Sequence, residues 1–433
     1  MKHGWLVAAC LCAIGFDSLQ SQTLTVTPNN ILSDETAVIR VAGLEPNQHV
    51  TIQAELADGA DQRWKSQAEF LADTQGAIDL SRQAPLKGSY GEVSAMGLIW
   101  SMKPEEKHVE RYTSPRDFGT QIIELRLIAD GKQASSAQLQ QRTVAEGVRQ
   151  IKVQGQLHGV LFLPGTSGQH PGVLVVGGSE GGLPSQKAAW LASHGYAALA
   201  LAYFRYEGLP AELERIPLEY FGQALAWMRQ RPEILPDHIA VVGHSRGGEL
   251  ALQLGSMYTH ITAVVAYVPA NVRYAACCGR TQLPAWTWQG QPLAYYVPHN
   301  RSFPSPGATL EAAIAVEHSN GSILLISGDD DGVWPSSLMT TALANRLKSA
   351  HFPHAVQRLD YSRAGHHAGR PEIVPEWHGG SNVGGTPKGD AESSLDAIPK
   401  VLEFLRANLG VGDSTHTERR EDRENPLILS SQN

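Results

Sequence analysis

The feature that most constrains the fold is the pentapeptide Gly-His-Ser-Arg-Gly at residues 243–247. The five residues before it read His-Ile-Ala-Val-Val, an apolar run typical of a buried strand. The residues after it, 248–254, have the pattern of a helix. A strand that passes directly into a helix needs a tight turn, which the flanking glycines allow. The pattern therefore predicts that Ser245 projects its hydroxyl from a sharp strand-to-helix turn, as a nucleophilic serine does.

A second segment, Gly-Gly-Ser-Glu-Gly at residues 177–181, matches the same pattern and also follows an apolar run. Chain order separates the two serines, because two further strand candidates lie between the first strand of this half and the strand that leads to Ser245. In an α/β-hydrolase the nucleophile follows a central strand, and a glycine-rich loop after an earlier strand supplies an oxyanion-hole N–H. We therefore expect Ser245 to be the nucleophile. We expect backbone N–H groups of Arg246 and of the Ser179 and Glu180 segment to form the oxyanion hole.

The N-terminal part of the chain, residues 23–148, consists of short segments in which apolar and polar side chains alternate. The clearest strand candidates are residues 24–26, 37–41, 50–54 and 122–128. Pro, Asn, Asp and Gly separate them, and the Asp-Gly pair at 130–131 is typical of a hairpin turn. This pattern predicts an all-β, immunoglobulin-like sandwich of about seven strands.

From residue 149 to residue 410 the pattern changes, because strand and helix candidates now alternate. The strand candidates are 159–163, 173–177, 197–203, 238–243, 262–267, 322–327 and 355–361, and the helix candidates are 185–194, 216–230, 247–258, 336–349 and 391–408. This alternation predicts an α/β domain with a mostly parallel sheet covered by helices on both faces. Residues 270–320, rich in Pro, Gly, Trp and Tyr, interrupt it and form either a cap over the ligand end of the sheet or a long structural loop.

A catalytic acid and base are expected where the last two strands end. Three adjacent aspartates follow the strand at 322–327, and an acid in that loop would hold the catalytic histidine in one tautomer. Asp331 is the first choice, Asp330 is the second, and a solvated acidic turn is the alternative. After the final strand, His366 is the expected base and His367 the weaker candidate. The chain order serine, aspartate, histidine is that of α/β-hydrolases.

These residues predict acyl transfer through a covalent intermediate. His366 takes the proton of Ser245 as the hydroxyl attacks an acyl carbonyl, and water then releases the acyl-enzyme. This chemistry calls for no metal and no cofactor. The formal net charge of −8 argues against nucleic acid or an anionic membrane as the main partner. No apolar run reaches eighteen residues, so no spanning helix is expected. The expected partner is a small acyl substrate, and the oligomeric state stays open.

The two ends of the chain are expected to lie outside the folded domains. Residues 1–22 combine Lys2 with a short apolar stretch and predict a signal peptide, hence an exported protein; without that signal the protein is expected in the cytoplasm. Residues 411–433 are polar and charged, which predicts disorder. Outside the signal, the cysteines are the adjacent pair Cys277 and Cys278, which are either reduced or joined in a strained ring.

Seven further segments, taken together, form a pattern found in one family. They are residues 96–105, 191–196, 201–204, 218–221, 328–334, 364–366 and 384–387. On these segments the chain resembles the type I acyl-CoA thioesterase and bile acid-CoA:amino acid N-acyltransferase family. The acyltransferase branch of that family has cysteine at the nucleophile position, where this chain has Ser245. The resemblance therefore implies thioester hydrolysis, because an oxygen ester on serine is less open to attack by an amine than a thioester on cysteine.

Three interpretations of the function stay open at this level. The first is a serine hydrolase that cleaves acyl-CoA or another acyl thioester. The second is an exported carboxylesterase with the same triad, because members of the family act where CoA is present and an exported protein would rarely meet it. The third is a binding protein whose hydrolase domain is silent. Arg246, Arg280 and Arg301 could contact CoA phosphates or could simply be solvated.

Overall fold

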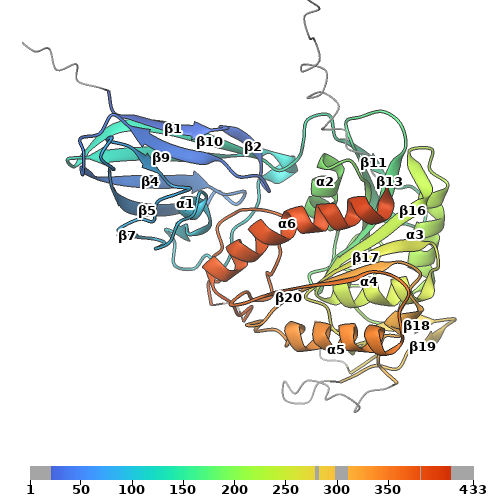
Figure 1. Ribbon diagram of the computed structural model, residues 1–433. Coiled ribbons are helices and arrows are strands. Elements are labelled where there is room, and N and C mark those ends of the chain that lie inside the picture. The colour runs from blue at the N-terminus through green and yellow to red at the C-terminus, as the bar shows by residue number, and fades with distance from the viewer. Residues whose placement is uncertain (1–20, 278–281, 298–310, 381, 411–433) are drawn as a thin grey trace, which may run out of the picture.

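The computed structural model describes residues 21–277, 282–297, 311–380 and 382–410. They form two parts that lie side by side, a β-sandwich built from the first third of the chain and a helix-covered sheet built from the rest (Figure 1). Apart from its last two residues, the predicted signal peptide at 1–22 lies outside the described residues, as do the predicted disordered tail, Arg280 and Arg301.

The sandwich consists of two sheets that share one apolar core. One sheet has the order β1-β3-β6 and the other β2-β10-β9-β4-β5-β7, with β8 beside β5. The strands are β1 (Thr23–Thr27), β2 (Asn30–Leu32), β3 (Val38–Ala42), β4 (His49–Ala57), β5 (Arg63–Leu71), β6 (Ile78–Asp79), β7 (Lys87–Gly88), β8 (Lys103–Pro104), β9 (Thr120–Ala129) and β10 (Lys132–Arg142). Along β4 every second side chain is buried, as expected for a strand with one face on a core.

Short elements and turns complete the sandwich. Helix α1 (Gly97–Trp100) and the 3₁₀ turn η1 (Arg116–Phe118) lie between β7 and β9. The predicted hairpin turn joins β9 to β10, and its residues Asp130 and Gly131 have φ values of 51° and 72°. These are the left-handed values that a two-residue hairpin turn needs, which explains the Asp-Gly pair.

The second part is built on one eight-stranded sheet of order β11-β12-β14-β13-β16-β17-β20-β21. Its strands are β11 (Arg149–Lys152), β12 (His158–Leu163), β13 (His170–Val176), β14 (Ala197–Ala202), β16 (Ile234–His244), β17 (Ile261–Tyr267), β20 (Ser322–Gly328) and β21 (Val356–Tyr361). The pairs from β14 to β21 are all parallel, whereas β11 and β12 pair antiparallel at one end. All six residues of β14 are buried, as is typical of a parallel strand covered on both faces.

Helices cover both faces of this sheet, as the alternating pattern predicts. They are α2 (Ser185–Ser193), α3 (Glu219–Arg229), α4 (Arg246–Met257), α5 (Ser336–Ser349) and α6 (Pro387–Leu409). Helices α2 and α6 pack on the face that carries Val173 and Val175, while α3, α4 and α5 pack on the face that carries Leu174 and Val176. The α/β architecture with an N-terminal β-sandwich is therefore confirmed.

The interruption at 270–320 contributes two strands to a small three-stranded sheet. Strands β15 (Ile216–Pro217), β18 (Trp286–Trp288) and β19 (Gln291–Pro292) form it, and the 3₁₀ turn η2 (Val316–His318) precedes β20. Cys277 is disulfide-bonded rather than reduced, and Cys278 lies outside the described residues.

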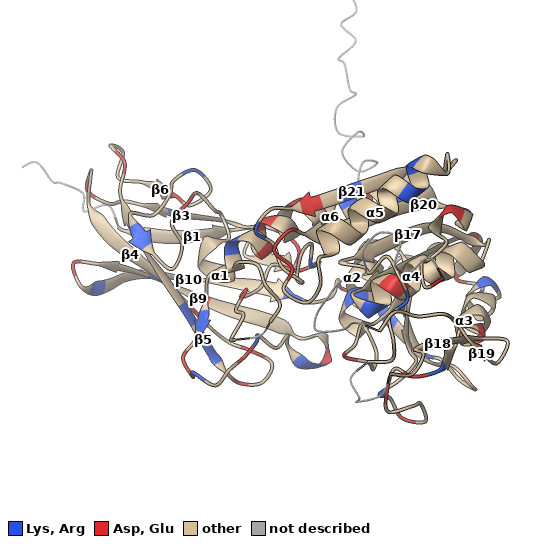
Figure 2. Cartoon of the chain, turned by 90° about the horizontal axis from the view of Figure 1, so that it is seen from below, with Lys and Arg blue, Asp and Glu red and all other residues tan. Residues whose placement is uncertain are grey.

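Acidic and basic residues are interspersed over both parts of the molecule (Figure 2). Among the described residues, no helix combines the length and the apolar character that crossing a membrane requires.

Candidate active site

Ser245 occupies a strained turn between β16 and α4. Its φ and ψ are 58° and −121°, a backbone conformation that residues other than glycine rarely adopt. The Ser245 N–H donates to the carbonyl oxygen of Tyr267, at the end of the neighbouring strand, at 2.9 Å. A Cβ at Gly243 would lie 1.9 Å from the carbonyl oxygen of Gly247, and one at Gly247 would lie 2.4 Å from that of Gly177. Both flanking glycines are therefore required by close backbone contact.

The structure brings Ser245, His366 and Asp331 together. The Ser245 Oγ lies 2.8 Å from His366 Nε2, and His366 Nδ1 lies 3.0 and 2.9 Å from the two carboxylate oxygens of Asp331. A carboxylate only accepts, so Nδ1–H donates to Asp331 and Nε2 accepts the serine O–H. Ser245 and His366 are 5% and 7% exposed. A hydroxyl, a base and an orienting acid in this sequence form the arrangement that activates a nucleophile.

The loop after β20 fixes Asp331 in this position. Asp331 Oδ1 also accepts the backbone N–H groups of Val333 and Trp334, at 2.9 and 3.3 Å. The Trp334 ring packs edge-on against the His366 ring, with 5.5 Å between centroids. Of the adjacent acids, Asp329 instead accepts the N–H of Arg363 at 2.7 Å. Asp331, the first choice from the sequence, is therefore the aspartate that contacts His366.

The histidine loop is held by two backbone contacts. His244 Nε2 donates to the carbonyl oxygen of His366 at 2.9 Å, and the His366 N–H donates to the carbonyl oxygen of Val383 at 2.8 Å. Burial lowers the pKa of His244 well below its usual value, with the nearby His366 adding to the effect, so His244 is neutral. Sequence reasoning missed His244, because the middle of a G-x-S-x-G motif admits many residues. His367, the weaker candidate base, instead lies 3.8 Å from Glu376.

The glycine-rich loop after β13 does lie beside the nucleophile, but Gly178 is the residue that approaches it. A Cβ at Gly178 would lie 3.3 Å from the Ser245 Cβ and 3.0 Å from the His244 carbonyl oxygen. The Gly178 N–H donates to Glu180 Oε1 at 2.9 Å, so the Glu180 carboxylate folds back over the loop. Arg246 is the first residue of α4, a position whose N–H has no acceptor within the helix. Sequence reasoning named Ser179 and Glu180 in this loop and missed Gly178.

The Arg246 side chain does not have the phosphate-facing position considered from the sequence. It is 4% exposed and donates to the carbonyl oxygens of Ala275 and Tyr274 at 2.9 and 3.1 Å. It also lies 3.3 Å from Glu249, whose carboxyl has a pKa raised by burial, against the effect of the guanidinium. Arg246 thus holds the 274–275 segment against the start of α4.

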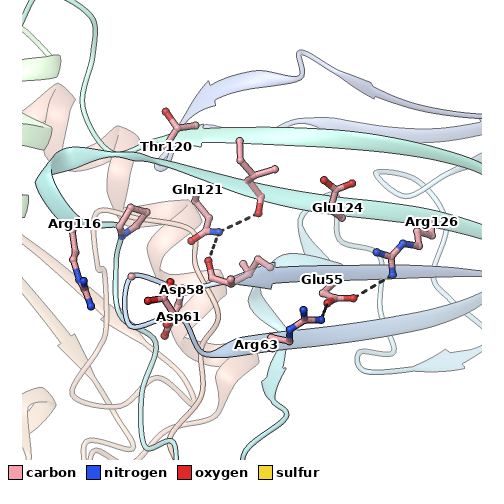
Figure 3. A pocket seen from close by; sticks show the side chains of 14 residues that line it. Glu55, Asp58, Asp61, Arg63, Arg116, Thr120, Gln121, Glu124 and Arg126 are labelled. Carbon is pink, nitrogen blue, oxygen red and sulfur yellow. Dashed lines mark hydrogen bonds and ion pairs between the residues drawn. The ribbon is translucent and has the colours of Figure 1, made fainter.

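A hollow of about 510 Å³ opens elsewhere, on the sandwich between β4, β5 and β9 (Figure 3). Three of its charged side chains pair with one another. Glu55 accepts from Arg63 at 2.8 Å and from Arg126 at 3.2 Å, as the dashed lines in Figure 3 show. Ser245, His366 and Asp331 are not among the residues that line it, and its lining contains no serine and no histidine. The candidate active site is therefore at Ser245 and not in this hollow.

The parallel sheet, the serine on its strand-to-helix turn and the histidine beside an acid define the class of the protein as an α/β-hydrolase, here with an N-terminal β-sandwich. Comparison with known families is more specific. Residues 34–155 match the acyl-CoA thioester hydrolase/BAAT N-terminal region, and residues 216–411 match the BAAT/acyl-CoA thioester hydrolase C-terminal region. The chain belongs to the acyl-CoA thioester hydrolase/BAAT family, and the resemblance noted from the sequence is confirmed.

Relatives match almost the whole chain. Acyl-coenzyme A thioesterase 1 of Rattus norvegicus is 32% identical over 398 residues, covering 87% of this chain and 94% of its own. The Homo sapiens protein of that name is 33% identical, covering 88% and 95%. Peroxisomal succinyl-coenzyme A thioesterase of Mus musculus is 30% identical, covering 91% and 98%. Among solved structures, an alpha/beta hydrolase enzyme from a deep-sea metagenome library matches at 16% identity and a TM-score of 0.39, covering 62% of this chain and 100% of its own. The chain is an enzyme of the acyl-CoA thioester hydrolase class.

Proposed function

We propose that this protein hydrolyses acyl-CoA thioesters, with Ser245 as nucleophile, His366 as general base and acid, and Asp331 as the group that orients His366. The observation that carries the proposal is the 2.8 Å contact between Ser245 Oγ and His366 Nε2, backed by Asp331 at 2.9 Å. The thioesterase names of the relatives support the choice of an acyl-CoA as substrate.

The reaction follows from these contacts. As Ser245 Oγ bonds to the thioester carbonyl carbon, its proton moves to His366 Nε2, and Asp331 stabilises the imidazolium that forms. The tetrahedral intermediate collapses, the carbon–sulfur bond breaks, and His366 returns the proton to the leaving thiolate. Water then attacks the serine ester by the same route, with His366 first as base and then as acid, which releases the carboxylic acid and restores Ser245.

The oxyanion of each intermediate needs backbone donors. The Arg246 N–H at the start of α4 is one, and the loop of Ser179 and Glu180, with Gly178 nearest Ser245, supplies the other. In the structure the Gly178 N–H bonds to the Glu180 carboxylate at 2.9 Å. If Gly178 is the second donor, the Glu180 carboxylate has to move off it when the oxyanion forms.

Water is the proposed acyl acceptor. The nucleophile is a serine, so the intermediate is an oxygen ester, which reacts with an amine less readily than a thioester does. We therefore expect carboxylic acid and free CoA as products even when an amino acid such as glycine is present.

Replacement of Ser245 tests the proposal. We expect Ser245→Ala to lower kcat on acyl-CoA by about 10⁴-fold or more and to abolish labelling by a fluorophosphonate probe, because both need the serine oxygen. Ser179→Ala is the matched control in the competing G-x-S-x-G segment, and it should weaken labelling without abolishing it. Equal labelling of the wild type and Ser245→Ala would exclude Ser245 as the nucleophile. An unlabelled wild type would favour a silent binding protein.

The acyl carrier and the compartment are tested separately. Rates on a panel of acyl-CoA thioesters and aryl esters distinguish the thioesterase from a carboxylesterase, since only the former should prefer the CoA substrates. Export through residues 1–22 stays a prediction, and the relatives do not favour it, because they include proteins named as peroxisomal and mitochondrial. N-terminal sequencing of the mature protein decides it, because a removed signal peptide changes the first residue.

A further inference from the structure

A second cluster of reactive side chains lies next to the histidine loop and takes no part in the proposed chemistry. It consists of His367, Glu376, His378 and Asp390, and one ligand atom from each lies within 4.8 Å of the others. His367 directly follows His366, Glu376 and His378 belong to the segment before α6, and Asp390 is in the first turn of α6. Four residues from three segments therefore converge on one point.

The carboxylates of this cluster are buried with too few donors. Glu376 is 2% exposed, and neither of its carboxylate oxygens has a hydrogen-bond partner among the described residues. Asp390 is fully buried; its Oδ1 accepts the Gly365 N–H at 2.7 Å, whereas its Oδ2 contacts only His378 Nε2, at 2.8 Å, in the described part of the chain. Burying a carboxylate without hydrogen-bond donors costs roughly several kcal/mol of free energy. The nearby guanidinium of Arg370 lies 3.7 Å from Glu376, beyond hydrogen-bond distance, so the two carboxylates remain short of donors.

The donor set and its spacing fit a metal ion. Two imidazole nitrogens and two carboxylate oxygens are ligands typical of Zn²⁺. Zinc bonds of about 2.0–2.2 Å to such atoms place neighbouring ligands of a tetrahedral site about 3.3–3.6 Å apart. Two of the distances lie on either side of that spacing, 2.8 Å between His378 and Asp390 and 3.8 Å between His367 and Glu376, and all four ligand atoms lie within 4.8 Å of one another. Two carboxylates also balance the charge of a divalent ion. We propose that His367, Glu376, His378 and Asp390 bind one Zn²⁺ ion.

A network of ion pairs is the competing explanation. In it, a protonated His378 would pair with Asp390, and Arg370, whose Nη1 is 3.7 Å from Glu376, would neutralise Glu376. That network still leaves His367 Nδ1 and Glu376 Oε1 without a hydrogen-bond partner in the described structure. A bound ion takes His367 Nδ1 and one Glu376 oxygen as ligands, so the metal accounts for more of the buried polar groups.

The ion would be structural, because none of its ligands belongs to the triad. It would join three segments around the histidine loop. Asp390 holds the Gly365 N–H, His367 adjoins His366, and the Glu376 N–H donates to the carbonyl oxygen of Trp100 in the sandwich at 2.9 Å. This differs from the expectation of no metal, which came from the chemistry at Ser245 alone.

Metal content of the untagged full-length protein tests the site. We expect protein purified from zinc-supplemented cells to carry one zinc per chain by elemental analysis. Glu376→Gln and His378→Gln remove a ligand with little change in volume, so each should lower zinc affinity in equilibrium dialysis by at least about 10-fold to 100-fold. Two matched controls should keep one equivalent: Glu372→Gln, whose carboxylate lies 4.0 Å from Arg370 in the same segment, and His194→Gln, from the His194–Asp34 pair at 2.7 Å.

The wild type provides a second test that does not depend on whether the variants fold. X-ray absorption of the zinc protein should give only nitrogen and oxygen neighbours, at about 2.0–2.2 Å. Added zinc should raise the melting temperature of the wild type, since a ligand that binds only the native state stabilises it. A wild type that holds well under one equivalent after dialysis against zinc overturns the proposal, as does full zinc binding by folded Glu376→Gln and His378→Gln. None of these measurements uses a substrate, so they are independent of the proposed hydrolysis.

Discussion

Asp331 differs from the two aspartates before it in the residue that its side chain contacts, which is His366. It reaches His366 Nδ1 with both oxygens, and its side chain is fully buried. Asp329 instead receives the Arg363 N–H. The carboxylate of Asp331 thus selects the tautomer in which His366 Nε2 is free to accept the Ser245 proton.

Replacing Asp331 with asparagine should therefore prevent His366 from accepting the Ser245 proton while leaving the position of His366 unchanged. The asparagine side chain keeps the volume but presents an amide that favours the wrong histidine tautomer, so for Asp331→Asn we expect kcat on acyl-CoA to fall by about 10⁴-fold. The measurement is kcat at saturating substrate, with circular dichroism to show that the fold is kept. Asp330→Asn is the control and should stay within a few-fold of the wild type. Comparable losses in both variants would mean that the acidic turn acts as a whole.

Sequence could identify the residues of the candidate site that follow strand ends, but not those placed by contacts through space. Ser245, Asp331 and His366 each follow a readable strand, so their positions along the chain suffice to name them. Gly178 and His244 depend on distances between segments. The bond from His244 to the His366 carbonyl joins residues 122 positions apart, and no local pattern marks it.

At the level of elements, a buried lysine on α2 contacts a tyrosine ring at the end of β17. Lys187 on α2 has its Nζ 4.0 Å from the centre of the Tyr267 ring at the end of β17. Burial lowers the pKa of Lys187 from 10.5 to about 8, although the nearby Glu180 opposes the shift. The folded protein therefore holds a charged lysine at neutral pH at a cost in stability, which the ring contact offsets in part.

Lys187→Met should stabilise the protein at pH 7 and lose that advantage in alkali. Below pH 8 the lysine is charged in both the folded and the unfolded state, so the whole cost in stability is present. The pKa shift from 10.5 to about 8 limits this cost to about 3.5 kcal/mol. Between pH 8 and pH 10.5 the unfolded state binds more protons than the folded state, so the stability of the wild type rises with pH. The difference in free energy of unfolding between Lys187→Met and the wild type therefore shrinks. Denaturant unfolding of both proteins at pH 7 and pH 10 measures this difference in the free energy of unfolding. Lys152→Met, at an exposed position, should show no such trend, and an equal gain for Lys187→Met at both pH values would contradict the assignment.

The elements themselves were predictable where the pattern is local. All seven strands and five helices expected after residue 149 are present, with shifts at their ends. The helix expected from residue 216 begins at Glu219, because Ile216–Pro217 pairs with Trp286 and Thr287, about 70 positions away. Strand β10 has no clear sequence signature, because Lys132–Arg142 is mostly polar and becomes a strand by pairing with β9 across the hairpin.

At the scale of the molecule, the sandwich shares one apolar cluster with one face of the hydrolase sheet. One cluster of buried side chains runs from Leu24 in β1 to Leu409 in α6 and includes the face of the sheet covered by α2 and α6. Polar contacts cross the same boundary. Asp34 of the sandwich accepts from Trp190 Nε1 at 2.9 Å and from His194 Nε2 at 2.7 Å; Trp190 is in the C-terminal half of α2 and His194 directly follows it. These partners are more than 150 positions from Asp34, so the sequence could predict two parts but not how they join.

The Asp34 contact should make the two parts unfold together. Asp34→Ala leaves the Trp190 and His194 donors without their acceptor at a buried boundary, which costs about 1–3 kcal/mol for each group. In calorimetry the wild type should melt in one transition, whereas Asp34→Ala should melt at a lower temperature with a van't Hoff enthalpy below the calorimetric one, the sign of uncoupled parts.

Asp58 provides the matched comparison for this prediction. It is also buried and also accepts from a tryptophan, Trp64 Nε1 at 3.1 Å, but both residues belong to the sandwich. Asp58→Ala should therefore destabilise the sandwich itself, whereas Asp34→Ala weakens its attachment. The two variants should differ in Ser245 labelling at a temperature below the main transition, because only Asp34→Ala removes support from α2 beside the sheet that carries Ser245. If Asp34→Ala melts in a single transition at the wild-type temperature, the shared apolar core alone couples the two parts.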